Sequence, residues 1–161
     1  MTVDRGRIIR ETRQIGIQFE LLANQAVAQK GLTTVQARIL LHILTCSENG
    51  TSLTHIQRKS GYSKAALCDL VKQLKKKGYV RVEPCAQDNR RKLLFGTDKG
   101  AHVQEFLARS ISGVQDHLFQ GFSQEEIETL DRLQRKLLQN LSAMKQNGSD
   151  NGNDNKEVSK S

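Results

Sequence analysis

The residues of this 161-residue chain that could do chemistry are concentrated in one basic segment. From Arg58 to Lys92 the chain carries eleven lysine and arginine residues against three acidic residues, a net charge of +8. The rest of the chain carries fourteen residues of each sign and is neutral. A polyanion such as duplex DNA explains this concentration, because cations that neutralise phosphates release the counterions of the duplex. A merely solvated charged surface is the alternative, and the neutral remainder favours nucleic acid.

Residues for catalysis or metal binding do not follow a recognised spacing. There is no glycine-rich phosphate loop, and serine, histidine and aspartate are scattered without a motif. The four histidines, His42, His55, His102 and His117, show neither H-x-x-x-H nor H-E-x-x-H spacing. The sequence therefore predicts a protein that is not an enzyme, with no cofactor and no metal site. A weaker alternative is metal sensing through His42 and a histidine of the long helix that follows residue 100.

The three cysteines predict reduced thiols and a cytoplasmic protein, because their number is odd and none forms a C-x-x-C pair. Cys46 ends an apolar helix and is expected to be packed. Cys68 and Cys85 are expected beside the nucleic-acid surface, so oxidation of either would block binding directly. A thiol-based redox-responsive regulator is therefore an alternative function.

The elements expected to position the basic segment are two short helices and a hairpin. Apolar periodicity predicts helices over 52–59 and 63–77, with Gly61 between them where a left-handed backbone is needed. Strands are predicted over 79–83 and 92–95, around a polar, basic tip. Helices followed by a two-stranded wing of this kind predict a winged helix-turn-helix.

Helix starts and stops elsewhere are marked by local chemistry. Thr33 with Gln36, and Ser123 with Glu126, have the spacing of capping boxes, in which each partner accepts a hydrogen bond from the other's backbone N–H. Gly31 is expected to end the first long helix. There is no run of about 18 apolar residues, and the N-terminus lacks the apolar centre of a secretory signal, so no membrane partner is predicted.

The predicted fold class is mainly α (α+β), with one domain over residues 1–146. A winged lobe at about 32–100 is flanked by long helices at about 4–30 and 101–146. Their apolar stripes are longer than one small lobe could cover, which predicts dimerisation. The last segment, 147–161, has almost no apolar residue and is predicted to be a disordered tail.

The ordered string of motifs resembles the MarR family from Leu32 to about Leu141. The matching pieces are LTTVQARIL (32–40), GYSKAALCDLVKQLKKKGYV (61–80), DNRRKL (88–93), TDKG (97–100) and SQEEIETLDRLQRKLLQNL (123–141). The resemblance implies a homodimer with interlocking terminal helices and two winged lobes on a pseudo-palindromic operator in double-stranded DNA. It also implies repression that a small aromatic or phenolic acid releases.

DNA contacts are expected from the second helix of the motif and from the wing. The helical residues expected at the groove are Ser63, Lys64, Ala65, Cys68, Asp69 and Lys72. In the wing, Arg90 is expected to insert into the minor groove, with Asp88 orienting its guanidinium. Arg91 and Lys92 are expected to hold phosphates. The alternative leaves Arg90 as a solvated cation.

Some positions depart from the pattern of the family. Asp69 stands where an arginine is common, and it could accept a hydrogen bond from cytosine N4. The alternative is an ion pair with Lys72 or Lys76. Gln57 replaces a small residue and Gly96 an apolar one, from which we expect a looser lobe.

An effector site between the lobes is expected to be lined by Phe19, His42 and Phe106, although apolar helix faces are more often plain core. The remaining alternative is a winged-helix module that binds RNA or a protein partner. RNA readers stack bases on aromatic side chains, and aromatic residues are few here. Packing in the turn and the strand explains Tyr62 and Tyr79 instead.

Overall fold

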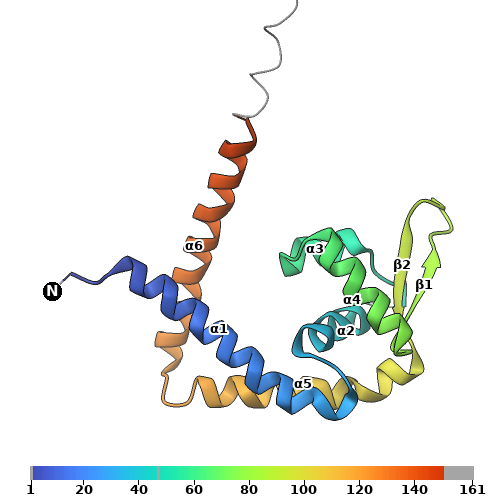
Figure 1. Cartoon of the computed structure of the whole chain (residues 1–161), viewed down its shortest axis with the longest axis horizontal. Coiled ribbons are helices and arrows are strands. Elements are labelled where there is room, and N and C mark those ends of the chain that lie inside the picture. Colours follow the sequence, from blue (N-terminus) through green and yellow to red (C-terminus); the bar gives the residue numbers. More distant parts are fainter. Residues whose placement is uncertain (1, 47, 151–161) are drawn as a thin grey trace, which may run out of the picture. The chain divides into compact units, whose positions relative to one another are not determined.

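The computed structural model describes residues 2–46 and 48–150. They divide into two units, of which the first ends at Leu118 and the second begins at Phe119. The first unit runs through α1 (Arg5–Val27), the short 3-10 helix η1 (Ala28–Lys30), α2 (Thr34–Thr45), α3 (Leu53–Ser60), α4 (Lys64–Lys76), β1 (Val80–Pro84), β2 (Lys92–Gly96) and α5 (Asp98–Leu118). The second unit contains α6 (Gln124–Asp150) (Figure 1). Residues 147–150 therefore continue a helix where the sequence predicted a tail, and the rest of that tail, 151–161, lies outside the described residues.

The helix ends follow the capping chemistry in the sequence. Thr33 and Gln36 form the predicted capping box at the start of α2. At the start of α6, the backbone N–H of Glu126 donates to Oγ of Ser123 at 3.2 Å, and Glu126 accepts from the backbone N–H of Ser123 at 2.8 Å. Gly31 ends η1 in the left-handed conformation, with φ 65°. Local chemistry thus sets these boundaries, as predicted.

The core of the first unit joins α1, α2 and α5 to the helix-turn-helix and the wing. α2 contacts α1, α4, α5 and β2, so it is the central helix of the unit. Figure 1 shows α2, α3 and α4 gathered beside the hairpin. The largest side chains with almost no exposed surface are Leu40, Ile43, Ile56, Leu67, Leu74, Leu94 and Leu107. This continuous core fixes α3, α4 and the hairpin on one support, because close-packed apolar contacts resist relative movement.

The hairpin is antiparallel, with Val80 opposite Gly96 at its base. A third segment joins it through Thr51, whose backbone N–H donates to O of Leu94 at 3.0 Å and whose O accepts from N of Leu94 at 2.7 Å. The loop before α3 is therefore anchored to β2. Helices followed by a two-stranded wing confirm the predicted mainly α, winged helix-turn-helix fold.

Gly96, which was expected to loosen the lobe, instead allows close packing. A β-carbon at Gly96 would lie 2.3 Å from Cδ2 of Leu44 on α2, closer than any van der Waals contact allows. The glycine therefore permits helix α2 to approach the end of β2. Gln57, the other expected source of looseness, is exposed on α3.

Two helices carry apolar side chains that the single chain leaves exposed. On α1 these include Ile8, Ile9, Ile15, Ile17, Leu21 and Leu22, and on α6 they include Leu133, Leu137, Leu138, Leu141 and Met144. Each of these side chains keeps between 42 and 69% of its surface accessible. Among residues 2–46 and 48–150, no helix is both long enough and apolar enough to span a bilayer.

Candidate nucleic-acid interface

The turn between α3 and α4 has the backbone geometry that a helix-turn-helix requires. Gly61 ends α3 with φ 72°, and its N–H donates to O of Gln57 at 3.1 Å. Ser63 then caps α4, because its Oγ accepts from the backbone N–H of Ala66 at 3.2 Å. A residue with a β-carbon would be strained at Gly61, so this glycine sets the angle at which α4 leaves the turn.

Helix α4 has one buried and one exposed face. Leu67, Val71 and Leu74 are buried against the core. The expected groove residues lie on the other side: Ser63, Lys64, Ala65, Asp69 and Lys72 are exposed, and Cys68 is half-buried. The structure therefore presents the helical set on one accessible surface, with Cys68 at its edge. The Ser63 oxygen accepts in the cap, which leaves its O–H able to donate to a ligand.

Asp69 does not form the ion pair that the sequence allowed as an alternative. Within the part of the chain that the structure describes, no ion pair joins Asp69 to Lys72 or Lys76. Its carboxylate is exposed on the same face as Lys64 and Lys72. Both of its oxygens therefore remain able to accept hydrogen bonds from a ligand.

The wing tip is ordered by its own backbone. The N–H of Cys85 donates to O of Arg91 at 2.8 Å, and the N–H of Arg91 donates to O of Asp88 at 2.9 Å. The Asp88 carboxylate accepts from the backbone N–H of Arg90 at 3.0 Å. Asp88 thus binds the backbone of Arg90 here, and the expectation that it orients the Arg90 guanidinium on DNA stays a prediction. A short aspartate side chain reaches the backbone two residues on, and here it shapes the turn that carries Arg90.

The basic residues of the segment fall into two groups. Lys77 is tied into the fold, since its Nζ donates to O of Gly31 and, at 3.0 Å, to Oε1 of Gln36. Arg81 pairs with Glu83, and its guanidinium lies 4.4 Å from the centre of the Phe95 ring. These two cations therefore have structural roles.

The other nine side chains are exposed and make no hydrogen bond or ion pair with the described residues. They are Arg58, Lys59, Lys64, Lys72, Lys75, Lys76, Arg90, Arg91 and Lys92. The excess charge is therefore carried by α3, α4 and the wing tip as cations that the fold itself does not use. Such a surface can hold several phosphates at once.

The three residues expected to share an effector site lie in different places. Phe19 lines a cavity of about 260 Å³ between α1 and α5, with the guanidinium of Arg38 5.2 Å from its ring centre. His42 lines another cavity, between α2 and α3. Phe106 lines a third, on α5, with Nζ of Lys30 5.0 Å from its ring centre. The structure does not bring them together in one pocket.

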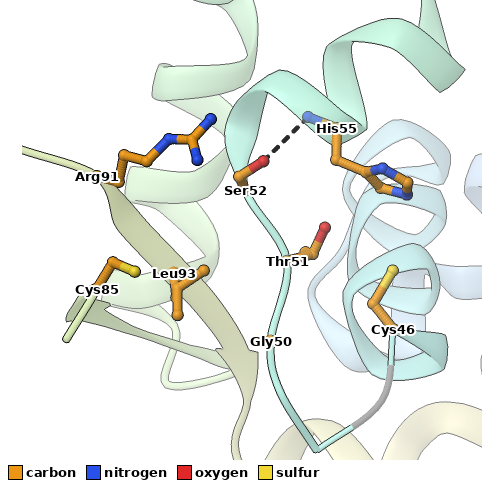
Figure 2. Close-up of a pocket in the computed structure, with 8 residues that line it drawn as sticks. All are labelled: Cys46, Gly50, Thr51, Ser52, His55, Cys85, Arg91 and Leu93. Atoms are coloured by element: carbon orange, nitrogen blue, oxygen red, sulfur yellow. Dashed lines mark hydrogen bonds between the residues drawn. The ribbon is translucent and has the colours of Figure 1, made fainter. Parts of the chain in front are cut away.

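A cavity of about 340 Å³ lies beneath the wing, between β2 and the start of α3. Figure 2 shows Cys85, Arg91 and Leu93 of the hairpin on one side and Cys46 and His55 on the other. All three cysteines of the chain are free and half-buried. The predicted redox roles of Cys68 and Cys85 stay predictions.

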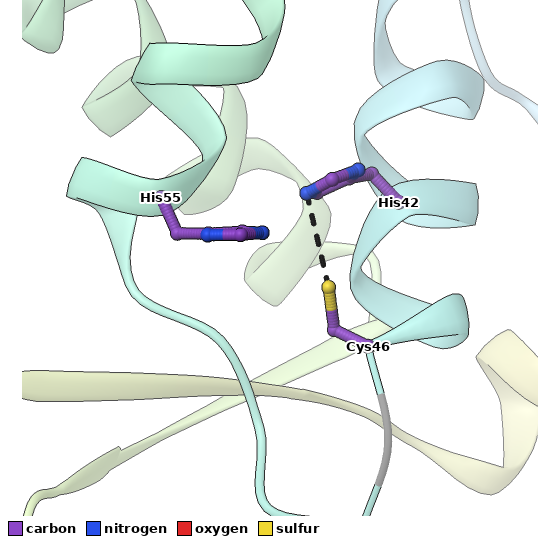
Figure 3. A group of neighbouring side chains, drawn as sticks. All are labelled: His42, Cys46 and His55. Atoms are coloured by element: carbon purple, nitrogen blue, oxygen red, sulfur yellow. Dashed lines mark hydrogen bonds between the residues drawn. The ribbon is translucent and has the colours of Figure 1, made fainter.

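A cluster at the end of α2 was missed by the sequence analysis. Cys46 Sγ lies 3.8 Å from Nε2 of His42, and the rings of His42 and His55 stack with centres 5.5 Å apart (Figure 3). Burial first, and then the nearby His55 and Lys59, lower the pKa of His42 from its ordinary value, so its neutral form is favoured. The H-x-x-x-C spacing of His42 and Cys46, which places them on one helix face, was the available signal.

The histidines of α5, which the sequence analysis considered as partners of His42, bind their own helix. Nδ1 of His102 lies 2.6 Å from O of Asp98, and Nδ1 of His117 lies 2.8 Å from O of Gly113. The neighbours of His42 are Cys46 and His55 instead. The proposed pairing of His42 with α5 is therefore wrong, because α3 covers this end of α2.

The chain is similar to a protein-family model and to a known protein. The model of the MarR family matches residues 30–91, from η1 to the wing tip. An uncharacterized HTH-type transcriptional regulator of Bacillus subtilis (strain 168), YybA, is 25% identical over 135 residues, which are 83% of this chain and 88% of that protein.

Among solved structures, the S. aureus MepR–DNA complex superposes with a TM-score of 0.77 at 21% identity, covering 86% of this chain and 99% of that one. A Listeria monocytogenes protein complexed with a 26mer DNA gives 0.77 at 20% identity, with 89 and 91% covered. A MarR protein from Peptoclostridium difficile gives 0.78 at 22% identity, with 89 and 93% covered. At these identities the likeness shows the fold.

Proposed function

Because this chain belongs to the MarR family of winged helix-turn-helix transcription regulators, we propose that it represses transcription as a homodimer bound to a pseudo-palindromic operator. The observation that carries the proposal is the set of nine exposed cations on α3, α4 and the wing tip that have no hydrogen-bond or ion-pair partner within the described chain. Two similar structures hold DNA, the MepR complex and the Listeria complex, and this supports duplex DNA as the partner.

Helix α4 is the element that we propose reads the major groove. Lys64 and Ala65 lie in its first turn, where a recognition helix meets the base edges. Lys72, two turns further on, is suited to a phosphate. Asp69 accepts a hydrogen bond from cytosine N4. This contact is worth about 1–3 kcal/mol of discrimination against the other bases.

The wing supplies the second set of contacts. Arg90 enters the minor groove, where a narrow groove concentrates negative potential. Arg91 and Lys92 hold the neighbouring phosphates. Asp88 acts on the backbone, because its bond to the N–H of Arg90 keeps the tip in the turn that projects the arginine. Rigid presentation of Arg90 lowers the entropy lost when it binds.

Dimerisation is supported by the apolar side chains that α1 and α6 each leave exposed. On α6, Leu133 and Leu137 keep 46% of their surface accessible, and Leu141 keeps 55%. Burying each such side chain contributes about 1.5–3 kcal/mol. A second copy of the chain would cover these stripes and present two wings, with half-sites about ten base pairs apart.

The proposed effector is a small aromatic or phenolic acid. The cavity beside Phe19 supports this class, since Ile15, Leu22 and Val114 give it apolar walls and His117 gives it a polar rim. Its volume of about 260 Å³ suits a single ring with one acidic group. The ligand would bind α1 and α5 together and alter the spacing of the two lobes.

The test is selection of bound duplexes from a random pool, followed by fluorescence anisotropy on the selected site at several salt concentrations. We expect a two-fold-symmetric site, and an affinity that falls steeply with salt because each neutralised phosphate adds about 0.9 to the log–log slope. An RNA of the same sequence is the competitor that separates duplex DNA from the RNA-binding alternative. A monomeric protein whose affinity ignored salt would contradict the proposal.

A further inference from the structure

We propose that His42, Cys46 and His55 form a binding site for a divalent transition-metal ion of the zinc class between α2 and α3. Imidazole nitrogen and thiolate sulfur are the ligand pair that Zn²⁺ and Co²⁺ prefer, and three such ligands leave a fourth tetrahedral position open. This inference does not depend on DNA binding, because the three side chains lie away from the exposed face of α4.

The first two ligands are placed by one helix. His42 and Cys46 are four residues apart at the end of α2, so both side chains leave the same helix face. Nε2 of His42 and Sγ of Cys46 are 3.8 Å apart. Bonds of about 2.0–2.1 Å from zinc to nitrogen and about 2.3 Å to sulfur put two tetrahedral ligand atoms about 3.3–3.6 Å apart. This pair therefore already has nearly the separation that an ion needs.

The third ligand comes from α3. The ligand atoms of His42, Cys46 and His55 all lie within 4.8 Å of one another. Figure 3 shows the two imidazole rings facing the sulfur from opposite helices. The His55 side chain is exposed and stacks on the ring of His42. Since tetrahedral ligand atoms lie about 3.3–3.6 Å apart, a rotation of the His55 side chain would have to bring its nitrogen at most about 1.5 Å closer to the other two ligand atoms.

A threonine hydroxyl without a hydrogen-bond partner belongs to the cavity that two residues of the cluster line. Thr51 is only 5% exposed, and its buried Oγ1 has no hydrogen-bond partner in the described chain. Buried hydroxyl groups are almost always paired, because an unpaired one loses its bond to water. In Figure 2 this hydroxyl points into the cavity that Cys46 and His55 also line. The cluster therefore borders a cavity with a polar group that the described chain leaves without a partner.

The position of the site suggests what the ion would do. It would join the C-terminal end of α2 to α3, and α3 packs against both α4 and β2. Three coordinate bonds would thus be added to the core contacts that already hold α2 and α3 together. Metal binding would therefore raise the stability of the lobe, since the unfolded chain has no such site.

The test is a titration of tag-free, reduced, chelator-treated full-length protein with Co²⁺. We expect one equivalent per chain, with the visible absorption of tetrahedral Co²⁺ and a near-ultraviolet band from thiolate-to-cobalt charge transfer. Added Zn²⁺ should bleach both, because zinc binds such sites more tightly than cobalt. Zn²⁺ should also raise the melting temperature.

The variants identify the ligands. Cys46→Ser should abolish the charge-transfer band, and His55→Ala should weaken Co²⁺ binding at least tenfold. Because His55 is exposed, His55→Ala keeps the test open even if the Cys46 variant folds poorly. Cys85→Ser is the matched control, since Cys85 lines the same cavity outside the cluster, and His102→Ala controls for a surface histidine. Both controls should bind Co²⁺ as the unmodified protein does.

Two results would overturn the proposal. One is a spectrum of octahedral Co²⁺ with no charge-transfer band in the unmodified protein. The other is a charge-transfer band that survives in Cys46→Ser or disappears in Cys85→Ser, since either would assign the thiolate elsewhere. Loss of DNA binding in the same preparations would leave the metal proposal intact, because the spectra are read without DNA.

Discussion

The wing tip and helix α6 are both exposed, but they expose opposite chemistry. The tip presents Arg90, Arg91 and Lys92 without a partner in the fold, whereas α6 presents leucines. A solvated cation loses little by remaining in water, but it gains when it replaces the counterions of a phosphate chain. An exposed leucine gains only when another apolar surface covers it. The difference supports the proposal that the first surface meets DNA and the other meets a second copy of the chain.

The largest effect on binding is expected when charged side chains replace leucines of the apolar stripe on α6. In the double variant Leu137→Glu/Leu141→Glu, four glutamates would enter the interface of a dimer, and each lost leucine contact contributes about 1.5–3 kcal/mol. We expect the dimer dissociation constant to rise more than a hundredfold and operator binding to be lost with it. Sedimentation velocity measures the first effect and anisotropy the second.

The control for this double variant is Gln139→Glu, which adds charge to an exposed position of α6 outside the leucine stripe. Glutamate is a good helix former, so the helix itself should persist in all variants, as circular dichroism would report. A double variant that sediments like the unmodified protein would assign the stripe to something other than dimerisation.

The next effect is expected at the wing. Arg90→Ala should weaken operator binding more than tenfold, which corresponds to about 1.4 kcal/mol or more, because the minor-groove contact is lost. The dimer should be unaffected. Arg109→Ala is the matched control, since Arg109 is an exposed arginine on α5 that pairs with Glu105. An unchanged gel shift of the Arg90 variant at moderate salt would contradict the assignment.

Much of the fold and the basic surface could be predicted from the sequence, because local interactions determine them. The capping residues Thr33 and Ser123, and the turn at Gly61, follow from interactions within a few residues of the chain, and the structure confirms them. The basic segment was visible because charge can be counted without a fold. Helix α6 was predicted from its capping box and apolar period, although it continues through Asp150 despite the polar composition there.

Contacts between elements were less predictable. The approach of Leu44 to Gly96 depends on how α2 packs against β2, and the sequence shows neither the distance nor the direction. The cluster of His42, Cys46 and His55 needs α3 to fold over the end of α2. The bond of Asp88 to the Arg90 backbone is local but was also not predicted, because a backbone N–H two residues away competes with a guanidinium for the same carboxylate.

A smaller effect is expected from the one exposed anion of α4. Asp69→Asn keeps the shape of the side chain, but an amide pairs best with adenine where a carboxylate accepts from cytosine. We expect the preferred base at one position of each half-site to change, by about 1–3 kcal/mol of discrimination, with little change in overall affinity. Selection from a random pool with both proteins measures this. If both proteins selected the same sites, Asp69 would not contact a base and would only be a solvated side chain.

The smallest effect is expected from single cations of the basic segment, and it should depend on whether the cation already has a partner in the fold. Lys72→Ala removes one proposed phosphate contact, so it should weaken binding a few-fold on every sequence and reduce the salt slope by about 1. Arg81 lies in the same basic segment and carries the same charge, but Glu83 and the Phe95 ring already hold it. Arg81→Ala should therefore leave the slope unchanged. If the two variants lowered the slope equally, the total charge of the segment would govern DNA binding, and the division into structural and available cations would fail.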